Sequence, residues 1–172
     1  MKIKNLVDKT TSFLFKRLSE LTGLALLFLS LLLLASLISY SPEDPNFIFP
    51  ENADIKNFLG AKGSYASDIL YQSIGLISLL IPISIFLISL SLIVNKKILQ
   101  IIESLFFIIL YSITGTLFFT VFHTETYWLT INGNNGFVGH LFQESFLINI
   151  INLNNQISYV ILIILILLFF LL

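Results

Sequence analysis

The sequence contains no cysteine and few charged side chains, and each deficit limits what the protein can be. Without cysteine it forms no disulfides, offers no thiolate nucleophile and holds no cysteine-based metal site. Charged residues make up only 11% of the chain, against 56% hydrophobic residues, whereas soluble domains carry roughly 25% charged residues. Because so few charges do not cover that much apolar surface, we expect lipid to surround most of the chain.

Catalytic signatures are also missing. The sequence has no P-loop, no G-x-S-x-G element, no H-E-x-x-H element and no dinucleotide-binding fingerprint. Its net charge of −1 gives no electrostatic basis for binding nucleic acid. We therefore predict that this segment is not an enzyme and has no catalytic residues, no cofactor and no metal ion.

Long apolar runs predict an all-α fold, an integral membrane bundle of four transmembrane helices. The first run is 20 residues long, or ~30 Å as a helix, which matches a hydrocarbon core. It is too long for a cleaved signal peptide, the alternative reading of a basic N-terminus, and no small-residue cleavage site follows it. The last run has no closing polar flank, so we expect a fragment or a longer natural protein. The predicted spans cover residues 21–40, 69–94, 98–122 and 156–172.

Polar connections separate the spans. They are an N-terminal segment (1–20), two loops (41–68 and 123–155) and a short turn (95–97). In the first loop, Pro42 and Pro45 are expected to end the first helix, because a residue before proline avoids the helical region. In the second loop, Tyr127 and Trp128 are typical of an interfacial aromatic belt.

Individual residues also predict where helices start and bend. Ser67 and Asp68 are expected to open the second span as its N-cap and first-turn acid. Pro82 is expected to kink that span. Residues 137–151 are partly amphipathic, which predicts a helix lying on the membrane surface before the fourth span.

Basic residues predict the orientation. Seven of the nine Lys and Arg lie in residues 1–20 and 95–97, and the other two lie in the first loop. The positive-inside rule therefore places both segments in the cytoplasm and the loops 41–68 and 123–155 outside it. An even number of spans returns the C-terminus to the cytoplasm.

Glu103 is the one acid well inside a predicted span. A charge at the bilayer centre costs roughly 2.5–3.5 kcal/mol, so such residues usually have a function. However, Glu103 lies only ~7.5 Å along the helix from Ile98. We expect it to reach the headgroup region and pair with Lys96 or Lys97, and a proton or ion path is the alternative.

Two histidines and three glycines are further candidates. His123 and His140 lack a cysteine or a suitably spaced acid beside them, so we interpret them as interfacial or solvated rather than as metal ligands. Gly133, Gly136 and Gly139 favour a tight turn into the surface helix over contact with a ligand.

Short motifs in a fixed order resemble a known family. Glu20-Leu21-Thr22-Gly23 opens the first span, Ser-Tyr-Ser-Pro-Glu-Asp-Pro-Asn at 39–46 closes it, and N-x-x-G-x-x-G-x-x-x-x-D at 57–68 leads into the second. Together these motifs resemble the N-terminal four-span membrane region of the FtsK/SpoIIIE DNA translocases. The positions that carry the resemblance are Glu20, Gly23, Tyr40, Pro42, Asp44, Pro45, Asn57, Gly60, Gly63, Asp68, Pro82, Gly133, Gly136 and Gly139.

The resemblance implies a function that involves more than this segment. Full-length family members continue through a linker into a cytoplasmic RecA-like ATPase motor that pumps double-stranded DNA. ATP, Mg and DNA are therefore expected only at the motor. The membrane region would anchor the motor at the division septum of the bacterial inner membrane, in cell division and chromosome segregation. Its expected partners are membrane lipid, other division-site membrane proteins and further copies of itself in a ring.

A small transporter or channel subunit is the alternative function. Such proteins show paired intramembrane charges or broken helices in both halves. Here Pro82 and Glu103 are the only candidates for those features. A membrane enzyme acting on lipid would need polar groups converging at one membrane depth, which the sequence does not show.

Overall fold

The computed structural model of the chain describes residues 2–46, 54–124, 129 and 131–172. Tyr127 and Trp128 lie outside the described residues. All regular elements in the described part are helices, which confirms the all-α prediction. They are α1 (Lys2–Ile38), α2 (Gly60–Ile74), the 3-10 helix η1 (Gly75–Leu79), α3 (Leu80–Asn95), α4 (Gln100–Phe122), α5 (Gly136–Gln143), α6 (Phe146–Asn152) and α7 (Asn155–Leu171).

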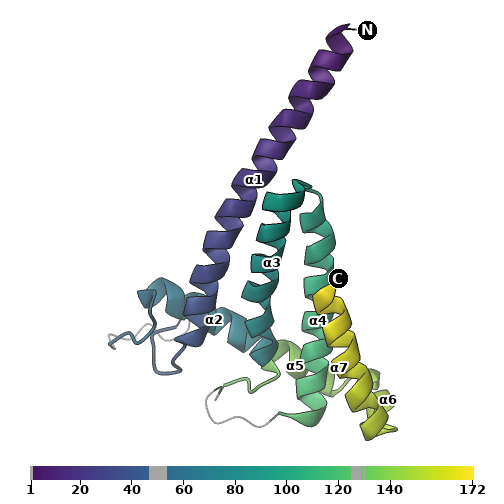
Figure 1. Ribbon diagram of the computed structural model, residues 1–172. Helices are drawn as coiled ribbons and strands as arrows, with labels where there is room; N and C mark the ends of the chain where they lie inside the picture. The colour runs from purple at the N-terminus through teal and green to yellow at the C-terminus, as the bar shows by residue number, and fades with distance from the viewer. Residues whose placement is uncertain (1, 47–53, 125–128, 130) are drawn as a thin grey trace.

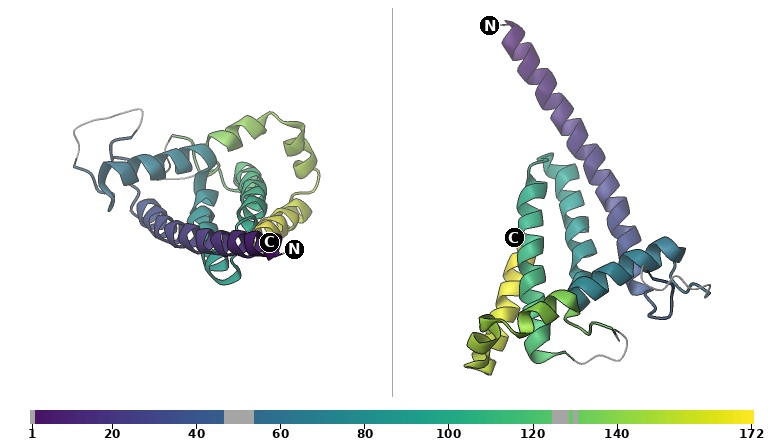
Figure 2. Two further views of the ribbon diagram at one scale, coloured as in Figure 1. Left: turned by 90° about the horizontal axis from the view of Figure 1, so that it is seen from above. Right: turned by 180° about the vertical axis from the view of Figure 1, so that it is seen from behind.

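An antiparallel hairpin of α3 and α4 forms the centre of the molecule. α1 packs along α3, and α7 packs along α4 (Figure 1). At one end of the hairpin, α2 and α5 lie crosswise to α3 and α4 (Figure 2). We call this the loop end, made by α2, η1, α5 and the described residues 39–46 and 54–59 between α1 and α2. We call the opposite end the hairpin end, where residues 96–99 join α3 to α4 and α1 projects beyond them.

Three helical stretches are long and apolar enough to cross a membrane. They are Asp8–Ile38, Gly60–Asn95 and Gln100–Phe122. A fourth crossing is possible by length only if α6 and α7, which are bent by 115° relative to each other, count as one span. α7 alone has 17 residues, or ~25 Å, which is short of a ~30 Å core. The described structure thus gives three candidate spans, or up to four.

The first helix is longer than the predicted span. α1 begins at Lys2 and includes most of the segment 1–20 that was expected to be a separate polar region. No glycine or proline occurs between Lys2 and Thr22, so no residue in that stretch strongly disfavours a helix. The cytoplasmic location of this segment stays a prediction.

The second predicted span is divided into three helices. α2 ends at Gly75, whose φ of 70° and ψ of −149° lie outside the helical region, and the chain then turns through η1 into α3 (Figure 1). Ser67 and Asp68 are not an N-cap, because α2 begins earlier, at Gly60, and both are buried within it. Pro82 does not kink the span, because it lies in the first turn of α3, where its missing N–H costs nothing.

The predicted surface helix at 137–151 is divided into α5 and α6. α5 packs against α2 and α4 through its buried glycines Gly136 and Gly139, and the chain bends at Glu144 and Ser145 before α6. Its location on the membrane surface stays a prediction.

Candidate functional site: a polar interface at the loop end

Most of the motif residues meet at the loop end. They form two groups that come from distant parts of the sequence. We call the first the clasp, residues 36–46 and 54–72, which joins the end of α1 to α2. We call the second the Asn134 loop, residues 133–139 with Gly75 and Leu76, which joins the end of α4 to η1.

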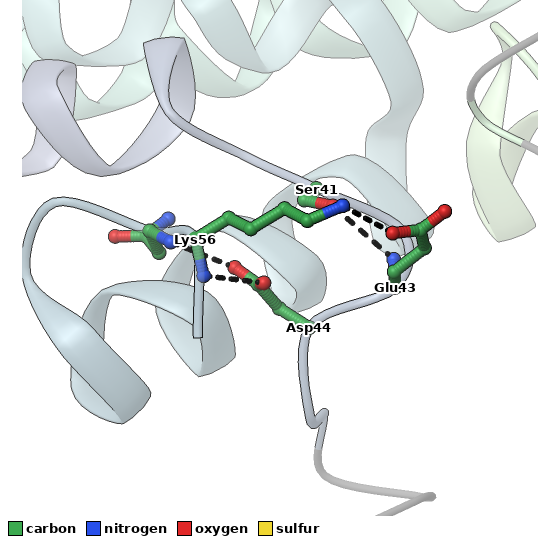
Figure 3. Close-up of polar contacts among 5 residues, drawn as sticks. Ser41, Glu43, Asp44 and Lys56 are labelled. Atoms are coloured by element: carbon green, nitrogen blue, oxygen red, sulfur yellow. Dashed lines mark hydrogen bonds and ion pairs between the residues drawn. The ribbon is translucent and has the colours of Figure 1, made fainter. Parts of the chain in front are cut away.

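Asp44 is the buried centre of the clasp, with 5% of its surface exposed. Its two carboxylate oxygens accept the backbone N–H groups of Lys56, at 2.8 Å, and Asn57, at 2.9 Å (Figure 3). Bonds of this kind to a charged acceptor are stronger than bonds between neutral groups. Asp44 therefore holds the chain before α2 against the chain after α1.

Glu43 makes the neighbouring contact at the surface. Its carboxylate pairs with the Lys56 ammonium (Figure 3). That hydrogen bond lowers the pKa of Glu43 and raises the pKa of Lys56. The backbone N–H of Glu43 donates to Ser41 Oγ at 3.3 Å, which shapes the turn between the two prolines. Pro42 is exposed in this turn.

Asn57 connects α1 to the start of α2. Its Nδ2 donates to the backbone oxygen of Ser36 at 2.9 Å, and its Oδ1 accepts the N–H of Leu59 at 3.1 Å. The Ser36 hydroxyl in turn donates to the backbone oxygen of Gly63 at 2.6 Å. A Cβ on Gly63 would lie 2.1 Å from Asn57 Oδ1, so this contact requires glycine.

Two further motif residues, Pro45 and Gly60, have separate roles in the clasp. The backbone oxygen of Pro45 accepts the Ser64 hydroxyl at 2.7 Å, which holds the chain after the turn against α2. Gly60 begins α2 with a φ of 64°, a left-handed conformation that glycine adopts without strain.

Tyr40 and Asp68 close the clasp next to the apolar core of the loop end. The Tyr40 hydroxyl donates to Asp68 Oδ1 at 3.3 Å, and its ring packs on Tyr71 with centroids 4.9 Å apart. Burial, reinforced by the Asp68 charge, raises the pKa of Tyr40 to about 12. Tyr71, Leu37 and Leu129, each 1% exposed, form the core beneath.

The Asn134 loop is held by close backbone contact. The N–H of Leu76 donates to the backbone oxygen of Asn134 at 2.9 Å. A Cβ on Gly75 would lie 1.9 Å from that oxygen, and a Cβ on Gly136 would lie 2.5 Å from the nitrogen of Gly75. Gly75, Gly133 and Gly136 all have positive φ. The glycines predicted to allow a tight turn therefore also allow η1 to approach the loop.

Asparagine side chains attach the same loop to α4. Asn134 Nδ2 donates to the backbone oxygen of His123 at 2.9 Å, and Asn135 Nδ2 donates to Thr120 Oγ1 at 3.3 Å. Gly139 lies against Asn135 so closely that an added Cβ would be 2.4 Å from the Cβ of Asn135. Sequence reasoning assigned no role to these asparagines. Their position between glycines is the signal that could have indicated a structured loop.

Comparison with known proteins points to the same family as the motifs do. Residues 15–172 match the family described as the 4TM region of DNA translocase FtsK/SpoIIIE. The chain belongs to this family. The resemblance found in the motifs is thereby confirmed, and the FtsK 4TM region is a membrane region without the motor domain.

Two curated relatives support this assignment. The chain is 36% identical over 69 residues to DNA translocase FtsK of Rickettsia bellii and 33% identical over 69 residues to DNA translocase FtsK of Rickettsia prowazekii. Each match covers 40% of this chain and 9% of the relative, so the chain spans only a small part of the relatives' length. No solved structure matches.

Two further motif residues of this 4TM region, Glu20 and Gly23, lie at the hairpin end. The Glu20 carboxylate pairs with Arg17 at 2.6 Å and with Lys96 at 2.5 Å, which ties α1 to the end of α3. Gly23 allows the two helices to touch, since a Cβ there would lie 3.0 Å from the backbone oxygen of Ser89. The Ser19 hydroxyl donates to the backbone oxygen of Leu92 at 3.1 Å beside them.

The prediction that Glu103 pairs with Lys96 or Lys97 is wrong. Lys96 pairs with Glu20 instead, and no ion pair in the described part of the chain includes Glu103. Glu103 does lie in the first turn of α4, near the favourable end of the helix dipole as predicted.

The two histidines lie on different elements. His123 follows the last residue of α4, with its ring 5.5 Å from Phe118, and His140 is exposed on α5. Within the described residues, no group of three or more histidine or acidic side chains is placed to hold a metal ion.

Proposed function

We propose that this chain is the membrane anchor and assembly region of a septal DNA translocase that acts in cell division and chromosome segregation. Membership of the FtsK/SpoIIIE 4TM family carries this proposal. The ATP-driven motor, with its ATP, Mg and DNA, belongs to the longer protein. The proposal places the chain in the bacterial inner membrane with both termini in the cytoplasm.

The loop end supports an assembly role. The clasp attaches the end of α1 to α2. The Asn134 loop is attached to η1 by a backbone hydrogen bond. A surface built in this way is held rigidly, and rigid surfaces lose less entropy on binding. We infer that the loop end contacts other division proteins or further copies of the chain.

The transporter alternative has less support. Glu103 is exposed in the first turn of α4 at the hairpin end rather than in mid-span. A carboxylate this close to the helix end reaches the lipid headgroup region. Its presence therefore does not require an ion path through the membrane.

Septal targeting tests the proposal. A fluorescent fusion to residues 1–172, expressed in the native host, is expected to gather at the division site. The fusion with Asp44→Ala should lose this enrichment while staying in the membrane, because the clasp is opened. Glu43→Ala, which changes the exposed neighbouring acid, serves as the matched control and should localise as the wild type does. Even distribution of the wild-type fusion around the cell membrane would refute the targeting role.

A further inference from the structure

A groove at the hairpin end holds two charges of opposite sign. It has a volume of about 710 Å³ and lies between α1 and the α3–α4 turn, with Phe15, Asn95, Lys97, Gln100 and Glu103 among its lining residues. That volume falls within the range of ligand-binding clefts, roughly 300–1,000 Å³. The groove therefore has the size and the polarity to bind a ligand.

Neither charge is satisfied by a protein partner among the described residues. The ion pairs at this end use Arg17, Glu20 and Lys96. Lys97 and Glu103 line the same groove, yet no ion pair joins them to each other or to another described residue. Both side chains are exposed. The groove thus presents a cation and an anion that are not paired with each other.

Polar and apolar groups surround these charges. Asn95 Nδ2 donates to Ser91 Oγ at 2.9 Å, and Ser91 Oγ donates to Gln100 Oε1 at 2.8 Å, which holds both amides in place at the wall. Phe15 and Leu99 add apolar surface beside them. A charged rim next to apolar surface at the end of a membrane helix suits a molecule with a polar head and an apolar tail.

We propose that this groove binds a phospholipid whose head group carries both a phosphate and a primary ammonium, the phosphatidylethanolamine class. Lys97 pairs with the phosphate, and Glu103 accepts hydrogen bonds from the ammonium. Phe15 and Leu99 contact the start of the acyl chains. The two head-group charges are joined by a short ethylene link, so a single head group supplies a partner for both side chains. This inference needs only that the chain lies in a membrane, so it does not rest on the proposed function.

Other phospholipids fit less well. An anionic phosphatidylglycerol head group would meet Lys97 but would leave Glu103 facing a negative charge. A phosphatidylcholine head group has a cation but no N–H donor, so it makes no hydrogen bond to the Glu103 carboxylate. The preference for phosphatidylethanolamine over the other two lipids therefore measures the contribution of Glu103. The total amount of bound lipid measures the contribution of Lys97, because all three lipids carry a phosphate.

Native mass spectrometry of the purified chain tests the site. The chain is mixed with equal amounts of phosphatidylethanolamine, phosphatidylcholine and phosphatidylglycerol of the same acyl composition. Wild type should retain phosphatidylethanolamine best. Glu103→Gln should lower its retention by about fivefold and abolish its advantage over phosphatidylcholine, and Lys97→Ala should lower retention of all three lipids by about fivefold.

Matched controls separate the groove from the general surface. Glu144→Gln and Lys62→Ala change exposed charges at the loop end and should leave lipid retention unchanged. Glu103→Asp keeps the carboxylate and should keep the preference for phosphatidylethanolamine. Best retention of phosphatidylglycerol by wild type, equal retention of the ethanolamine and choline lipids, or an unchanged preference in Glu103→Gln would each overturn the proposal.

Discussion

At the scale of single residues, Glu43 and Asp44 are adjacent acids with different surroundings. Glu43 meets the Lys56 ammonium in solvent, where an ion pair adds little stability. Asp44 is buried and is the acceptor for two backbone N–H groups of the segment before α2. The clasp should therefore depend on Asp44 and hardly on Glu43.

Asp44→Ala tests this difference. The substitution leaves the N–H groups of Lys56 and Asn57 without their acceptor, so we expect a loss of about 1–3 kcal/mol in the free energy of unfolding. Reversible unfolding in mixed detergent micelles measures it. Glu43→Ala is the matched control and should unfold almost as the wild type does. Equal losses in the two variants would show that burial of Asp44 is not what stabilises the clasp.

The sequence motifs marked residues that lie together in the structure, but the sequence did not predict all of the ion pairs. Asp44, Asn57 and Gly63 were selected by position alone, and all three belong to the clasp. The partner of Glu103 was predicted wrongly because Lys96 and Lys97 are close in sequence, whereas α1 brings Glu20 to Lys96 from much farther away. Such partners depend on how helices pack, which hydropathy does not reveal.

At the scale of elements, two glycines with positive φ differ in their surroundings. Gly60 has a φ of 64°, and an added Cβ there would meet nothing within 4 Å. Gly75 has a φ of 70°, and its Cβ would lie 1.9 Å from the backbone oxygen of Asn134. An alanine would thus strain the backbone at both sites but would collide with a neighbour only at Gly75.

Gly75→Ala should cost more than Gly60→Ala. Backbone strain alone predicts a loss of about 1–2 kcal/mol for Gly60→Ala. At Gly75 the collision adds to the strain, for a total of about 2–5 kcal/mol. Hydrogen exchange should also show faster exchange of the Leu76 amide in Gly75→Ala only, because that amide donates to Asn134. Similar costs at the two sites would mean that η1 and the Asn134 loop do not depend on close contact.

The division of the second predicted span could not be read from its hydropathy. Residues 69–94 are mainly apolar and contain no charged residue, and one glycine inside such a run does not by itself end a helix. The end of α2 at Gly75 follows from its contact with the Asn134 loop, roughly sixty residues away in sequence. α3 ends at Asn95, close to the predicted span end at Val94, whereas the locally predicted helix start at Ser67 and Asp68 was wrong.

At the scale of the whole molecule, the helices form two pairs. α1 packs along α3 and α7 packs along α4, and the pairs meet at the hairpin turn and at the loop end (Figure 1). The short turn predicted the α3–α4 hairpin. It did not predict which of those helices α1 would join, because apolar helix faces are similar. Small residues such as Gly23 decide that choice by allowing close approach.

A hydrogen bond between two hydroxyl groups links the α1–α3 pair to the α4–α7 pair, and its coupling energy is a testable quantity. Ser84 of α3 and Tyr111 of α4 are 3.0 Å apart, beside a cavity of about 180 Å³ that Phe170 of α7 also lines. A double-mutant cycle of Ser84→Ala and Tyr111→Phe should give a coupling energy of about 0.6 kcal/mol, at most ~1.7 kcal/mol, as for other hydrogen bonds between membrane helices.

The control for this cycle uses a serine on the same helix. The Ser89 hydroxyl donates to the backbone oxygen of Phe86 within α3, at 2.6 Å. Ser89→Ala combined with Tyr111→Phe should therefore show no coupling, because the two side chains share no bond. Unfolding in mixed micelles supplies all the free energies. If the Ser84 cycle gave the same value as the control, water in the neighbouring cavity would be satisfying both hydroxyls, and the two helix pairs would be joined only at their ends.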